Sequence, residues 1–225
     1  MKKTLALGLA LTVLTYPTFA SAQFGGLGGL AKQATGGGAT SGGVSAADTG
    51  AFLTNATAST KNVMIAAALL AQAAKDRNGL ASQKVNIETL QNIQKPSELK
   101  AHEQQLTSDL GALSSNANLA DNIGQAYSQG TSAQKELIAT ALGNLALGIY
   151  RNTQLASQAP GFVSGAAGNP QLLSRIGDIK TVASLLGLQT KGLATIAPVL
   201  PKLFSAVKLP ALKASAATEP KPVKF

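Results

Sequence analysis

The sequence contains no cysteine, no tryptophan and a single histidine among its 225 residues. Without cysteine the chain forms no disulfide bond, offers no thiolate to a metal ion and has no thiol nucleophile. An anchoring lipid attached through cysteine is excluded for the same reason. Any metal site or catalytic triad based on imidazole would have to use His102 alone.

Aromatic residues are also scarce, with six Phe and three Tyr. Apolar residues nevertheless make up 45% of the chain, so the core must be built mainly from Ala, Leu, Ile and Val. Small and aliphatic side chains suit closely packed helices better than stacked sheets. We therefore predict an all-α protein, a bundle of about five or six helices.

The first 22 residues have the three regions of a secretory signal peptide. Lys2 and Lys3 are basic, residues Leu5–Leu14 are largely apolar, and Ala20-Ser21-Ala22 is a small-residue cleavage site. We expect cleavage after Ala22, which leaves Gln23 as the first residue. The expected location is the periplasm of a bacterium or the medium, and the cleaved chain is not expected to be an integral membrane protein.

Composition divides the remaining chain into four parts. Glycine loses the most backbone entropy when it is ordered, so the glycine-rich stretch is predicted to be a flexible arm. Lysines and prolines gather near the end of the chain and predict a broken, basic extension and a disordered tail. The expected order is arm 23–46, helical bundle 47–188, basic extension 189–217 and tail 218–225.

Apolar residues at helical spacing predict helices over residues 47–77 and 97–113. Residues 83–94 alternate like a strand and also fit a helix, and we favour the helix.

The strongest helix begins where Thr131 and Gln134 form a capping box, and its apolar pattern extends to Gln158. A loop is expected at 160–168. The pair Asn169 and Pro170 then has the pattern of an N-cap and first turn, which predicts another helix.

The charge is unevenly distributed. Loss of the signal peptide leaves a net charge of +7, and residues 180–225 hold +6 of it because seven lysines there face only Glu219. Such a segment suits an acidic protein or an anionic envelope surface. Nucleic acid is not an expected partner, because no aromatic residues alternate with the lysines and an exported protein does not meet it.

Four of these lysines are spaced eleven residues apart, which is close to three helical turns. In a continuous helix they would form a stripe for contact with an anionic surface, beside an apolar face containing Leu193, Ile196, Leu203 and Phe204. Pro198, Pro201 and Pro210 argue against continuity, and the alternative interpretation is a set of broken helices with solvated lysines. The candidate contact residues are Lys180, Lys191, Lys202, Lys208 and Lys213.

Catalytic motifs occur only as fragments. His102-Glu103 begins like the zinc-binding pattern His-Glu-x-x-His, but Leu106 stands where the second ligand would be, so we expect a structural histidine on a leucine-rich helix face. The Ser-x-x-Lys pattern of serine-lysine hydrolases occurs three times without its companion motifs. Its copies are Ser97/Lys100, Ser132/Lys135 and Ser205/Lys208. We predict no catalytic residue, metal or cofactor.

These observations favour an exported, non-enzymatic protein with a binding or structural role in the periplasm or cell envelope. Its partner would be another protein, an anionic envelope surface or an apolar ligand held between helices. Two alternatives remain from the sequence: a secreted or membrane-active effector that uses the basic segment, and a serine-lysine hydrolase.

Overall fold

The computed structural model describes residues 44–215 and 218–225, and none of them lies in a β-strand. The all-α prediction is confirmed. The predicted signal peptide and most of the predicted glycine-rich arm lie outside the described residues. The α-helices are α2 (Ala46–Lys75), α3 (Lys84–Asn92), α4 (Pro96–Lys100), α5 (Glu103–Ser115), α6 (Leu119–Gln129), α7 (Ser132–Ala167), α8 (Ile176–Ile196) and α9 (Leu200–Ala206). Short 3-10 segments lie at η1 (Arg77–Gln83), η2 (Pro170–Arg175) and η3 (Ala197–Val199).

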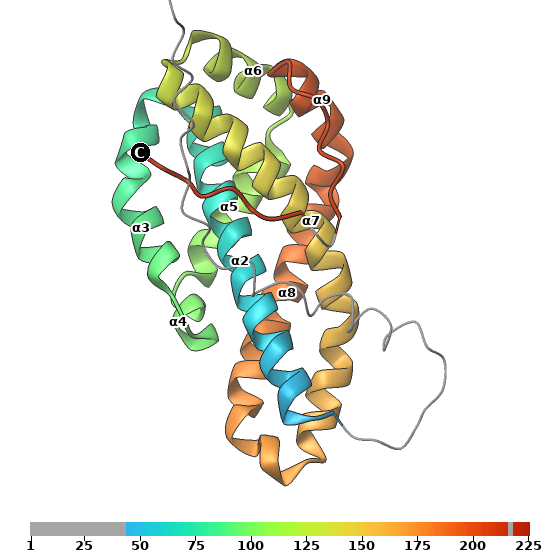
Figure 1. Ribbon diagram of the computed structural model, residues 1–225. Coiled ribbons are helices and arrows are strands. Elements are labelled where there is room, and N and C mark those ends of the chain that lie inside the picture. The colour runs from blue at the N-terminus through green and yellow to red at the C-terminus, as the bar shows by residue number, and fades with distance from the viewer. Residues whose placement is uncertain (1–43, 216–217) are drawn as a thin grey trace, which may run out of the picture.

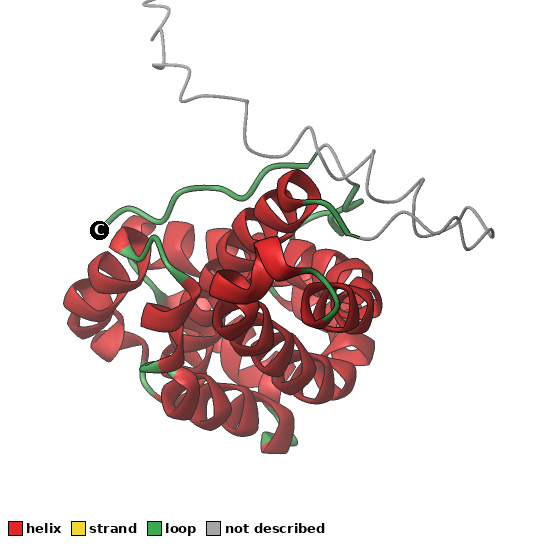
Figure 2. Ribbon diagram, turned by 90° about the horizontal axis from the view of Figure 1, so that it is seen from below, coloured by secondary structure: helices red, strands yellow, loops and turns green. Residues whose placement is uncertain are grey.

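Three long helices form the frame of the molecule. In Figure 1, α2 runs upward, α7 runs downward beside it, and α8 runs upward again. Local capping fixes where α2 and α7 begin: the Ser45 hydroxyl accepts a bond from the Asp48 N–H, and Thr131 and Gln134 form the predicted capping box. The upper half of the frame is covered by α3, α4, α5, α6 and α9, whereas among the described elements only the long helices and η2 form the lower half (Figures 1 and 2).

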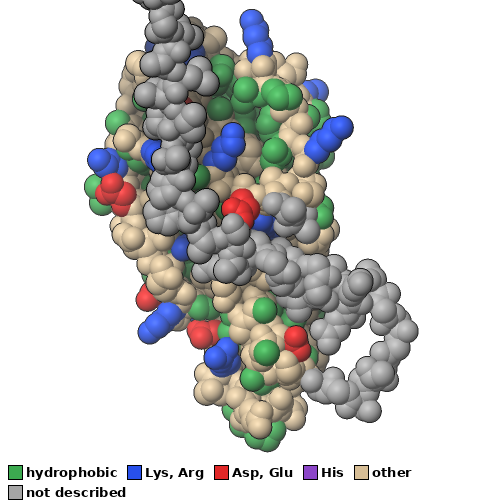
Figure 3. Space-filling model, in the orientation of Figure 1, with side chains coloured by type: hydrophobic (Ala, Val, Ile, Leu, Met, Phe, Trp, Pro, Cys, Tyr) green, Lys and Arg blue, Asp and Glu red, His purple; other side chains and the backbone are tan. Residues whose placement is uncertain are grey.

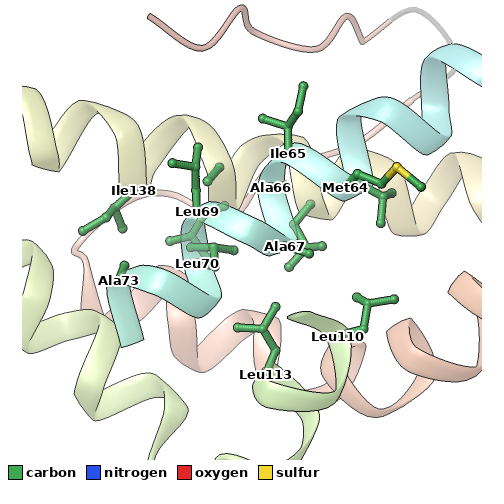
Figure 4. Close-up of a cluster of buried hydrophobic side chains, with 14 of the residues drawn as sticks. Met64, Ile65, Ala66, Ala67, Leu69, Leu70, Ala73, Leu110, Leu113 and Ile138 are labelled. Carbon is green, nitrogen blue, oxygen red and sulfur yellow. The ribbon is translucent and has the colours of Figure 1, made fainter. Parts of the chain in front are cut away.

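The apolar core has two parts. The upper core joins α2 to α5 and α7, and in Figure 4 Leu110 and Leu113 of α5 point toward Ala67 and Leu70 of α2. The lower core is smaller and contains the stacked rings of Phe52 and Phe162, whose centroids are 4.2 Å apart.

A layer of polar side chains separates the two cores, and we call it the polar layer. Gln189 Nε2 of α8 donates to Thr60 Oγ1 of α2 at 2.9 Å, and Thr190 Oγ1 donates to Asn152 Oδ1 of α7 at 2.8 Å. Asn152 Nδ2 in turn donates to the Leu186 carbonyl at 3.2 Å. A slide of one helix by a turn would break these bonds, so they hold the three long helices in register.

Two helix boundaries differ from the sequence prediction. Residues 97–113 form two helices, α4 and α5, with a turn at Ala101 and His102. The predicted loop at 160–168 is helical instead, because α7 continues through Pro160 to Ala167. Pro160 is exposed, so the helix loses one backbone bond there without a steric conflict in the core.

The predicted basic extension is part of the fold. The boundary expected at Leu188 falls inside α8, and the chain continues through η3 into α9. Pro198 and Pro201 each stand in the first turn of a new helical segment. Backbone N–H groups in a first turn donate no bond within their helix, so a proline is tolerated there. These prolines therefore divide the rod formed by α8, η3 and α9 without reversing the direction of the chain.

The predicted helix at residues 83–94 is present as α3. The segment 218–225, predicted to be a disordered tail, has instead a defined extended path on the surface of the bundle. Its contacts define the candidate site.

Candidate peptide-binding groove

Residues Thr218–Phe225, which we call the tail segment, lie in a groove between α2, α3 and α7. Figure 1 shows the dark red segment crossing in front of α2, and Figure 2 shows it outside the layer of helices. The segment is extended and forms no helix or strand. It reaches the groove after a reversal at Lys208, whose φ of 55° ends α9 in the left-handed conformation.

Asn144 of α7 binds both backbone groups of one tail residue. Its Oδ1 accepts the Lys221 N–H at 2.8 Å, and its Nδ2 donates to the Lys221 carbonyl at 2.8 Å. The amide thus takes the place of a neighbouring β-strand. Because Asn144 is only 4% exposed, leaving its amide unpaired would be costly, and the Lys221 backbone meets this need.

The flanking prolines fit this arrangement. In an extended chain the N–H and carbonyl of successive residues point to opposite sides, so Pro220 and Pro222 turn their backbone away from Asn144. A proline has no N–H, so neither residue presents an unpaired donor on the outer side. Proline also favours the extended conformation in advance, which lowers the entropy lost on docking.

Arg151 of α7 is the second anchor of the tail segment. This side chain is 1% exposed, and its Nη2 donates to the Thr218 carbonyl. Burial lowers the pKa of Arg151, while the negative charge of Glu219 acts in the opposite direction. The groove therefore holds a buried positive charge beside an exposed carboxylate of the tail.

The spacing of the two anchors matches the tail. Asn144 and Arg151 are seven residues apart, which places them on one face of α7 with a rise of about 10 Å. Their partners Lys221 and Thr218 are three residues apart, and an extended chain covers about 10 Å over that distance. The tail segment therefore runs antiparallel to α7 and in register with it.

The far end of the tail is held by α3 and by the upper core. Gln91 Nε2 donates to the Val223 carbonyl at 3.1 Å, and the Val223 side chain is 8% exposed within the upper core. Ile65 of α2 points toward the ribbon of the tail segment in Figure 4 and lines the same cavity as Val223.

Lys61 of α2 stabilises the wall of the groove. Its Nζ donates to the carbonyls of Gln91 and Ile93 at 3.2 and 2.9 Å, where α3 ends. A cation at this position satisfies carbonyls that have no partner in the helix. Burial lowers the pKa of Lys61.

The tail segment does not fill the groove. A cavity of about 600 Å³ lies between the tail and the side that contains Lys61, Asn62 and Ile65. A second cavity of about 390 Å³ lies toward α7 and α9, beside Gly143 and Leu147. Both cavities have a mixture of apolar and polar walls, as small-ligand and peptide sites have.

The five lysines predicted to contact an anionic surface are all exposed. Lys180 and Lys191 lie on α8, Lys202 on α9, Lys208 at the reversal after it, and Lys213 in the extended chain that follows. Figure 3 shows the basic side chains of one face standing apart from one another.

The apolar residues expected to accompany these lysines are not on the surface. Leu193, Ile196, Leu203 and Phe204 are between 1% and 6% exposed and belong to the upper core. They are therefore unavailable for insertion into a bilayer while the protein is folded. Within the described residues, no helix has both the length and the apolarity to cross a membrane.

The remaining candidate motifs lie outside the groove. The predicted leucine stripe places His102 on an apolar helix face, but the structure places it half-buried in the turn before α5. In the part of the chain that the structure describes, no three His, Cys, Asp or Glu side chains gather as a metal site. The serines of all three Ser-x-x-Lys pairs are exposed, at Ser97, Ser132 and Ser205.

No protein-family model, curated protein or solved structure matches this chain. The groove is therefore interpreted from its own geometry. Sequence analysis did not identify its anchors, although one signal was present: Asn144 and Arg151 are polar residues two helical turns apart within the strongest predicted helix. Their partners lie about 70 residues away, and no local pattern connects them.

Proposed function

We propose that this is a non-catalytic binding protein that holds an extended peptide segment of a partner protein in the groove between α2, α3 and α7. One observation carries the proposal: buried Asn144 binds both the N–H and the carbonyl of one extended residue. Recognition of backbone groups supplies affinity for an extended peptide of many sequences, as strand addition does at a sheet edge.

The other anchors support the same function. The Arg151 guanidinium and the Gln91 amide also donate to backbone carbonyls, so three side chains read the main chain of the tail segment. The signal-like first 22 residues are consistent with a partner in the periplasm or cell envelope.

The test uses the full-length protein with Lys221→Pro, which removes the N–H that Asn144 accepts and weakens the internal occupant. A fluorescein-labelled peptide with the sequence of residues 218–225 should bind this protein saturably in an anisotropy titration. Adding Asn144→Leu, which is similar in size but forms no hydrogen bond, should abolish binding. Adding Asn144→Asp should weaken it, because a carboxylate accepts the N–H but repels the carbonyl.

The matched control is Gln125→Leu in the same background, since Gln125 is exposed on α6 away from the groove. It should bind the peptide as the Lys221→Pro protein does. Circular dichroism establishes that each variant is folded. A folded Lys221→Pro protein that does not bind the peptide, or equal binding after Asn144→Leu, would contradict the proposed function.

A further inference from the structure

The tail segment shows which features of a peptide the groove can read. At Lys221 only the backbone is bound and the side chain is exposed, so this position accepts any residue that has an N–H. Proline alone lacks that donor. We refer to this place in a bound peptide as the anchor position.

Two side chains of the tail add specificity on either side of the anchor position. Glu219, two residues before it, directly follows Thr218, whose carbonyl accepts a bond from Arg151, so the Glu219 carboxylate is held near the buried guanidinium. Val223, two residues after it, buries an aliphatic side chain in the upper core. Glu219 is exposed at the rim of the groove, whereas Val223 is buried, so the first feature acts through its charge and the second through burial of apolar surface.

The tail segment is also an imperfect occupant. Cavities of about 600 and 390 Å³ remain beside it, and its two prolines line the larger one without filling it. A peptide with larger apolar side chains next to the anchor position would bury more surface in the same groove. Such a peptide could replace the tail although the tail is tethered, and tethering by a short linker gives an effective concentration on the order of millimolar.

We infer that the tail segment is an internal competitor for the groove, and that the partner peptide shares its pattern: a carboxylate two residues before a non-proline anchor and an aliphatic side chain two residues after it. This inference rests on the proposed function. The groove is closed by the chain itself until a partner of this class displaces the segment.

The first test compares full-length wild-type protein with the full-length variants Lys221→Pro and Val223→Asp. The probe is the labelled peptide of residues 218–225. Because the internal competitor lowers the apparent affinity of the wild type, both variants should bind the probe at least about tenfold more tightly than the wild type. Two variants are used because Val223 is buried in the core and its substitution also affects stability.

The second test changes the peptide and leaves the protein folded as it is. With the Lys221→Pro protein, a peptide carrying Lys221→Ala should bind within about twofold of the original, since only its backbone is read. A peptide carrying Lys221→Pro or Val223→Asp should lose at least about tenfold in affinity. A Glu219→Gln peptide should bind several-fold more weakly at low salt, with a smaller difference at high salt.

The outcomes separate this inference from the proposed function. Equal affinity of the probe for wild type and both variants would show that the tail does not compete, and peptide binding would stand. Equal binding of all the altered peptides would overturn the proposed pattern alone. A probe that binds none of the three proteins would overturn the proposed function and this inference with it.

Discussion

At the scale of single residues, the protein places polar groups deep in an apolar bundle and satisfies them with distant parts of the chain. Asn144 and Arg151 bind the tail segment. In the polar layer, Asn152 donates to Gln189, and Gln189 donates to Thr60. Buried polar side chains are costly when unpaired, so each such contact ties two remote segments together.

Asp109 is a buried carboxyl for which the cost of burial outweighs its hydrogen bond. It lies on α5, and its Oδ1 accepts a bond from Gln105 Nε2 at 2.8 Å. Burial raises the pKa of Asp109, and the bond from Gln105 opposes this rise only in part. The folded protein therefore binds the Asp109 proton more tightly than the unfolded chain does.

The first prediction follows from this sign. As pH rises from the unfolded pKa of about 3.9 through the raised folded value, ionisation of Asp109 reduces the free energy of unfolding. Asp109→Asn keeps an oxygen acceptor for Gln105 without the charge, so it should raise the melting temperature at pH 7. At pH 3 the two proteins should melt alike. A lower melting temperature for Asp109→Asn at pH 7 would contradict the prediction.

At the scale of elements, the approach of α2 to α7 decides how each glycine of α7 behaves. A Cβ built at Gly148 would lie 2.5 Å from Val63 Cγ2 of α2, which is too close for a real contact. A Cβ at Gly143 would meet no atom within 4 Å. The two positions share a helix and a residue type and differ in what faces them.

The second prediction uses this matched pair. Gly143→Ala should stabilise the protein by up to about 1 kcal/mol, because alanine favours the helix and nothing opposes its methyl group. Gly148→Ala should destabilise it by about 1–3 kcal/mol, because buried Val63 must move. Urea unfolding of both variants gives the two free energies, and changes of the same sign would refute the assigned α2–α7 contact.

At the scale of the whole molecule, the lysines from Lys180 to Lys213 stay on the surface while the apolar residues between them face inward. The rod of α8, η3 and α9 buries Leu193, Ile196, Leu203 and Phe204 in the upper core. The folded protein therefore offers an anionic surface its charges and not an apolar face.

The third prediction concerns this surface. Folded protein should co-sediment only weakly with anionic vesicles, at roughly 1 kcal/mol for each lysine near the surface. Changing Lys191, Lys202 and Lys213 together to Gln should reduce the binding, and salt should abolish it because the Debye length falls to about 3 Å at 1 M. Neutral vesicles serve as the control. Binding that persists in high salt would indicate insertion of apolar side chains and contradict the assigned burial.

The fourth prediction concerns export. The order of basic, apolar and small-residue regions predicts cleavage after Ala22. Intact-mass analysis of protein recovered from the periplasm should identify Gln23 as the first residue. Replacing the small residues Ala20 and Ala22 with Leu should slow the cleavage, and uncleaved full-length protein in the cytoplasm would contradict the prediction.

The sequence by itself determined the helical class and several helix ends, because both depend on neighbours within a few residues. The period of apolar residues predicts α2 and α7, and the side chains of Thr131 and Gln134 specify where α7 begins. Local propensity was a poorer guide at the prolines. Pro160 lies within α7 because packing of the surrounding helices outweighs the loss of one backbone bond. Pro198 only divides the rod because it stands in the first turn of η3.

Only the tertiary structure decided the site. Its central contact joins Asn144 to Lys221, 77 residues later, and it depends on which face of α7 remains uncovered by other helices. The composition of residues 218–225 predicts disorder, because proline and lysine form neither a helix nor a core by themselves. Given a groove with a buried amide and a buried guanidinium, the same prolines favour docking in an extended form. The partner of each polar group is a property of the assembled fold, which no local pattern encodes.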